Sequence, residues 1–83
     1  MCTYQTEHAT VHGSAKGPAG WVSIDKASVY YDHPLHAQMD HSLNLDFVNS
    51  RDPSAGRVAL ELSPTSARSL VERITRTLDR AGL

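Results

Sequence analysis

The chain has 83 residues, a formal net charge of −1, 40% hydrophobic residues and 20% charged residues. A chain of this length can build one small core, so we expect a single domain over residues 1–83. The near-neutral charge argues against a nucleic-acid partner, because such proteins normally carry a basic surface. No apolar run approaches the roughly 20 residues of a membrane-spanning helix, so we also expect no membrane association.

The one cysteine, Cys2, cannot form a disulfide within the chain. The N-terminal residues lack the apolar stretch of a secretion signal. Together these features predict a cytoplasmic protein.

Two β-strands are predicted in the first part of the chain. Residues 3–12 contain threonines with Tyr4 and Val11, which is typical of an edge strand. Residues 13–20 are rich in glycine and predict a connecting loop. Residues 21–32 predict a second strand, bent or bulged near Asp25, with Trp21 buried as a core anchor.

Two further strands and a helix are predicted in the second part. Residues 41–49 and 57–62 alternate between apolar and polar side chains, as half-buried strands do. In the first of these strands, Leu43, Leu45 and Phe47 are expected to face the core, and Ser42, Asn44 and Asp46 to face outward. A helix is predicted from Ser63-Pro64, a cap followed by a proline, to Gly82.

The order of these elements predicts an α+β fold, ββββα, with a four-stranded, mostly antiparallel sheet and one C-terminal amphipathic helix across one face. One helix cannot cover four strands. We therefore expect the remaining sheet surface to form a homodimer or to bind a small molecule.

Histidines gather at the corner between the second and third strands. His33, His36 and His41 are three of the five histidines in the chain. A neutral imidazole offers a nitrogen to a metal ion, so we expect these residues to bind zinc, copper or iron, with no organic cofactor. Tyr30, Asp32 and Asp40 are candidate catalytic residues supporting this metal. Further possible ligands are Cys2, His8, His12, Asp32 and Asp40.

Two other functions fit the same residues. A histidine oriented by Asp32 or Asp40 can act as a general base without a metal, with Cys2 as a nucleophile. A non-catalytic accessory protein that dimerises through its sheet can instead hold a ligand or a partner. The aromatic contacts expected for that ligand are Tyr4, Trp21, Tyr30 and Phe47.

Several short segments along the chain form a recognisable pattern: MCTY at 1–4, GSAKGPAGW at 13–21, VYYDHP at 29–34, HSLNLDF at 41–47 and SAR at 66–68. This pattern resembles a family of short actinobacterial proteins of unknown function. The resemblance covers nearly the whole chain and implies a complete small protein, without implying an activity. If the expected metal site is catalytic, we expect its chemistry to belong to specialised metabolism.

Overall fold

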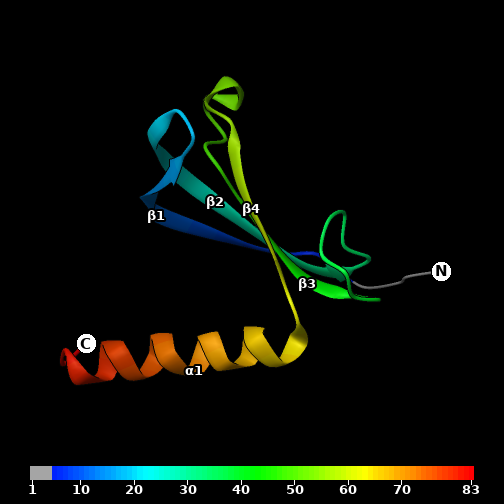
Figure 1. The fold of residues 1–83 in the computed structure, drawn as a ribbon. Coiled ribbons are helices and arrows are strands. Elements are labelled where there is room, and N and C mark those ends of the chain that lie inside the picture. The colour runs from blue at the N-terminus through cyan, green and yellow to red at the C-terminus, as the bar shows by residue number, and fades with distance from the viewer. Residues whose placement is uncertain (1–4) are drawn as a thin grey trace.

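The computed structural model describes residues 5–83, which form a four-stranded antiparallel sheet followed by one helix (Figure 1). The elements are β1 (Glu7–Gly17), β2 (Gly20–Asp32), β3 (Ser42–Val48), the short 3-10 turn η1 (Pro53–Ala55), β4 (Arg57–Leu62) and α1 (Pro64–Arg80). The strands pair in sequence order, so each neighbours the next along the chain. This arrangement confirms the predicted ββββα fold.

The first hairpin is tighter than the sequence predicts. The expected loop over 13–20 is wrong, because β1 continues to Gly17, which pairs with Gly20 across a turn formed by Pro18 and Ala19. Gly20 has a φ of +116°, a conformation that only glycine adopts without strain. Residues 3 and 4 of the predicted first strand lie outside the described residues.

A β-bulge interrupts the pairing of β1 with β2 between Thr10 and Gly13. These residues pair with Lys26 and Ile24, so β1 carries the additional residue opposite Asp25. The sequence predicts an irregularity at this level of the sheet, but in β2. The bulge breaks the alternation of side chains along β1, so residues before and after it follow different patterns of facing.

The register sorts the sheet into two faces of different chemistry. The apolar face carries Ala27, Val29, Tyr31, Leu43, Leu45, Phe47, Val58, Leu60 and Leu62. The mostly polar opposite face, called the polar face, carries Lys26, Ser28, Tyr30, Asp32, Ser42, Asn44, Asp46, Val48, Arg57, Ala59 and Glu61. This separation follows from the period of two in a strand.

Burial on the polar face differs from the prediction. Ser42 and Asn44 lie on the face opposite Leu43 and Leu45, as predicted, but Ser42 is fully buried and Asn44 is only 5% exposed. The reason is the loop over 33–41, which folds back over this end of the polar face and is tied there to Glu61. Ser42 donates its hydroxyl hydrogen to Asn44 at 2.7 Å, which satisfies the buried pair.

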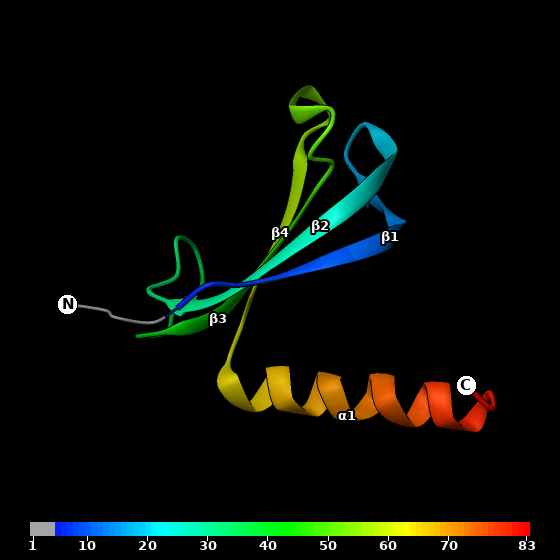
Figure 2. The same cartoon turned by 180° about the vertical axis from the view of Figure 1, so that it is seen from behind.

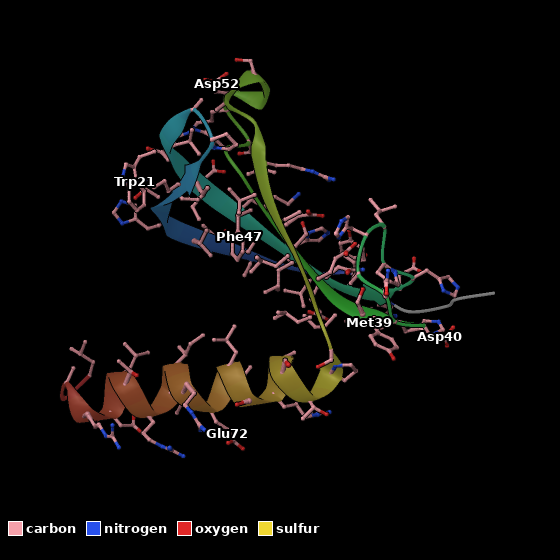
Figure 3. The ribbon with its side chains drawn as sticks, in the orientation of Figure 1. Trp21, Met39, Asp40, Phe47, Asp52 and Glu72 are labelled. Atoms are coloured by element: carbon pink, nitrogen blue, oxygen red, sulfur yellow. The ribbon has the colours of Figure 1, made fainter. Side chains whose placement is uncertain are left out.

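Trp21 is 69% exposed, so its predicted role as a core anchor is wrong. The pairing of β2 with β3 runs only from Lys26 to Asp32, which leaves β1 as the paired neighbour of the earlier part of β2. Trp21 therefore lies at the protruding end of the first hairpin, opposite Lys16. Figure 3 shows it at the end of the sheet remote from Asp40.

The helix begins and ends as predicted. Ser63 accepts a hydrogen bond from the Ser66 amide at 3.1 Å, Pro64 follows, and Gly82 lies beyond the last turn with a φ of +81°. Figures 1 and 2 show α1 along one side of the sheet, which it contacts mainly at β3. Within the part of the chain that the structure describes, no helix has the length and apolar character needed to cross a membrane.

Candidate functional site

The histidine loop, residues 33–41, is held by one carboxylate. Glu61 on β4 accepts hydrogen bonds from the backbone amides of Leu35 at 2.5 Å, His36 at 3.2 Å and Ala37 at 2.7 Å. The amides of Ala37 and Leu35 are the main reason why the pKa of Glu61 lies below its usual value. This anchor fixes the middle of the loop against the polar face.

The two ends of the loop bring His33 and His41 together. Asp32 pairs with Ser42 in the last step of the β2–β3 ladder, so the next residues outward on each strand are His33 and His41. Their ring centroids are 4.3 Å apart, and the ring of His41 also stacks on Tyr31 at 5.4 Å. The histidine pair is therefore a product of strand register.

Asp40 bonds to both of these rings. Its backbone carbonyl accepts from His33 Nδ1 at 3.1 Å, and its carboxylate accepts from His41 Nδ1 at 2.9 Å. Because both oxygens can only accept, Nδ1 carries the hydrogen in each ring, and Nε2 of the neutral ring is then the nitrogen able to coordinate. Asp32 accepts from the His33 amide at 2.7 Å and holds the start of the loop.

The structure brings together ligand atoms from His33, Asp40 and His41, all within 4.8 Å of one another. His36, the third histidine of the predicted set, is not a member of this group among the described residues, and its amide bonds to Glu61. His8 lies on β1 and interacts with Ser28. Cys2 lies outside the described residues.

The polar face next to the loop carries a network of paired groups. Tyr30 donates its hydroxyl hydrogen to Asp46 at 3.1 Å, and Arg57 lies 3.6 Å from the same carboxylate. Burial, followed by the bond to Asp46, raises the pKa of Tyr30. A shallow pocket of about 210 Å³ connects this network to the loop, and its lining includes Tyr30, Asp32, His33, Asn44, Asp46, Arg57 and Glu61.

Glu61 and the ion pair of Asp46 with Arg57 are site residues that the sequence did not predict. Their strands alternate clearly, so each residue could have been assigned to the polar face. The pairing of Glu61 with Asn44 and of Asp46 with Ala59 depends on the β3–β4 register. Sequence alone does not fix that register across the long connection from 49 to 56.

Comparison with known proteins identifies a family and no activity. A model described as a family of unknown function (DUF6295) matches residues 1–82. No curated protein and no solved structure matches the chain. The match agrees with the expectation of an uncharacterised family. The chain belongs to this family of unknown function, DUF6295.

Proposed function

We propose that the protein binds one transition-metal ion through His33, Asp40 and His41, and that it works as a homodimer. The observation that carries the metal proposal is the convergence of three potential ligand atoms within 4.8 Å. Two imidazoles and one carboxylate are a donor set used by zinc, copper and iron sites. Asp40 contributes either as a ligand or through the carboxylate–histidine contact that orients many metal-bound imidazoles.

Solvent access supports an open site rather than a closed structural one. The side chain of Asp40 is 92% exposed and that of His41 is 23% exposed. Three protein ligands leave at least one position for water or a small molecule, which is the arrangement of catalytic metal sites. When bound, such a metal supplies Lewis acidity and lowers the pKa of a coordinated water.

The neighbouring pocket supports a role in metal-assisted chemistry on a small polar molecule. His33 belongs both to the ligand group and to the pocket lining, so the pocket lies close to the proposed metal site. Asp32 and Tyr30 also line the pocket. In this proposal Asp32 positions the loop through the His33 amide, and the Tyr30 hydroxyl contacts the bound molecule.

The metal proposal is tested by calorimetric titration of tag-free protein with zinc, copper(II) and iron(II). His41→Gln and His33→Gln are expected to weaken binding by more than about tenfold, since each removes an imidazole ligand and its coordinate bond. His36→Gln is the matched control, because it changes the same residue type in the same loop without touching the ligand group. It is expected to bind like the wild type.

Two results would contradict this assignment. Absence of stoichiometric binding for all three metals would remove the metal function. A loss of affinity in His36→Gln as large as in His41→Gln would show that His36 is a ligand, as in the predicted set of three histidines. Asp40→Asn separates the roles of Asp40, because an amide keeps a hydrogen-bond acceptor for His41 but is a poorer metal ligand.

The pocket on the polar face favours a second candidate function, a metal-independent protein that binds a small polar ligand. It offers a hydroxyl, an amide and an ion pair in Tyr30, Asn44 and Asp46–Arg57. Ligand screening by thermal shift, with and without chelator, distinguishes the two candidates. A chelator-insensitive ligand whose effect is lost in Arg57→Gln would support the second.

A further inference from the structure

The hydrophobic side chains of the helix are exposed, and those of the sheet are only half-buried. Among the side chains that the structure describes, Ala27 is the only hydrophobic one classed as buried, at 6% exposure. On the apolar face Leu60 is 40% exposed, and none of the residues of α1 is buried. A domain normally buries its large aliphatic side chains. This chain has such side chains but does not bury them within itself.

The exposed area can be compared with that of a compact protein. A monomer of 9.1 kDa is expected to expose about 4,900 Å², whereas this chain exposes 6541 Å². The excess is roughly 1,600 Å². At least about 900 Å² of this excess is left even if the full area of residues 1–4 in an extended chain is subtracted from it. Two copies that bury this excess form an interface of about 1,800 Å² or more, the size of a stable dimer interface.

The uncovered surface of the helix is a continuous stripe. Leu70, Val71, Ile74 and Leu78 lie at helical spacing and are 41%, 63%, 53% and 47% exposed. Glu72 lies on the side of α1 away from the sheet, as Figure 3 shows. A helix of 17 residues is about 26 Å long and a strand of seven residues spans about 23 Å, so α1 is long enough to lie along the apolar face. The stripe from Leu70 to Leu78 occupies about 12 Å of that length.

The connection between β4 and α1 restricts how the helix can pack on its own sheet. Leu62 ends β4 and Pro64 begins α1, so Ser63 alone joins them, held by its capping bond to Ser66. Proline also fixes its own φ and restricts the residue before it. The stripe and the apolar face of one chain thus diverge from a short joint, so that the stripe stays exposed and the apolar face is only half-buried.

We propose that two copies of this chain associate about a twofold axis, with the stripe of each α1 lying on the apolar face of the other copy's sheet. Each copy then supplies both halves of the contact, as twofold symmetry requires. The net charge of −1 imposes little repulsion between copies. This inference specifies the surfaces of the proposed homodimer and does not depend on the metal.

Sedimentation equilibrium over a dilution series tests the association. The wild type is expected to have twice the chain mass of 9.1 kDa. Ile74→Asp adds a charge to the stripe in both copies and is expected to raise the dimer dissociation constant at least about 100-fold. Ser69→Asp adds the same charge to another side of the same helix and is expected to leave it within about threefold.

The arrangement itself is tested on the wild type by isotope-filtered NMR of a mixture of labelled and unlabelled chains. Nuclear Overhauser effects between the Ile74 methyls of one copy and Phe47 or Leu60 of the other are expected. If the protein is a dimer but these effects are absent, the proposed arrangement of the two copies is wrong, although the dimer itself stands. A monomeric wild type would overturn the homodimer, whatever the metal titration gives. Unfolding of Ile74→Asp while Ser69→Asp stays dimeric would support the proposal, since obligate dimers lose their fold on dissociation.

Discussion

Glu61 determines the position of the histidine loop more than any other side chain of the polar face. One carboxylate accepts from three consecutive backbone amides, those of Leu35, His36 and Ala37. Such charge-assisted hydrogen bonds are stronger than neutral ones. These bonds give the loop a defined conformation although it makes little apolar contact. They thereby also fix the positions of its two ends, which carry His33 and His41.

Replacement Glu61→Gln is expected to loosen the loop. The uncharged amide has one acceptor oxygen in place of two, so at least one of the three backbone amides loses its partner. Hydrogen exchange at residues 35–37 should become at least about tenfold faster. Glu72→Gln is the control, because the one ion pair of Glu72 among the described residues is the weak one with Arg73 at 4.0 Å. Unchanged protection in Glu61→Gln would show that the loop is held by other contacts.

The lowered pKa of Glu61 also gives the loop a pH dependence. A carboxyl whose folded pKa lies below its usual value of 4.5 stabilises the folded loop above that value. The contribution is lost as the pH falls through the folded pKa. Protection of residues 35–37 in the wild type should therefore decline on acidification below about pH 4.5, while Glu61→Gln should show no such decline. Parallel behaviour of the two proteins would contradict the assignment.

The candidate site was partly predictable at this scale. Three histidines and Asp40 are close in sequence, so a shared neighbourhood is expected from proximity alone. Which histidines meet depends on the β2–β3 register, in which Asp32 opposes Ser42. The next residues beyond these two strand ends are His33 and His41, which therefore lie opposite each other. His36 lies in the middle of the connection, where alternation does not apply, and the anchoring of its backbone by Glu61 is a contact between distant parts of the chain.

Among the elements, the junction of β4 and α1 has the clearest sequence signal. Ser63 caps the helix through Ser66, and Pro64 occupies the first helical position. Ser63→Ala is expected to lower the free energy of unfolding by about 1 kcal/mol, the usual effect of a lost cap. Denaturant titration at fixed chain concentration measures this change. Ser69→Ala, inside the same helix, should alter stability by less than about 0.5 kcal/mol, and an equal loss in both would exclude capping as the cause.

Strands with regular alternation were predicted almost to the residue, whereas the first hairpin was not. The predicted strand over 57–62 matches β4, and the alternation over 41–49 contains β3. Residues 13–17 read as a loop because glycine and alanine have low strand propensity. Pairing with β2 nevertheless makes them a strand, which is a tertiary effect that local composition does not contain.

For the whole molecule, the proposed dimer makes stability depend on concentration. If folding and association are coupled, mass action favours the folded dimer as chain concentration rises. With the usual enthalpy of about 0.7 kcal/mol per residue, the melting temperature should rise by roughly 4 °C for each tenfold increase in concentration. Scanning calorimetry across a concentration series measures this. A melting temperature independent of concentration would indicate that the monomer is stable with its apolar face open.

The bulge in β1 has a consequence for how such an open molecule avoids uncontrolled aggregation. β1 is one of the two outer strands of the sheet, and a regular outer strand offers a row of unpaired amides and carbonyls to other chains. The additional residue between Thr10 and Gly13 breaks that row and increases the local twist. Strand-by-strand growth into a fibre is therefore disfavoured along the β1 edge, whereas the proposed association through the faces of two sheets ends with the pair.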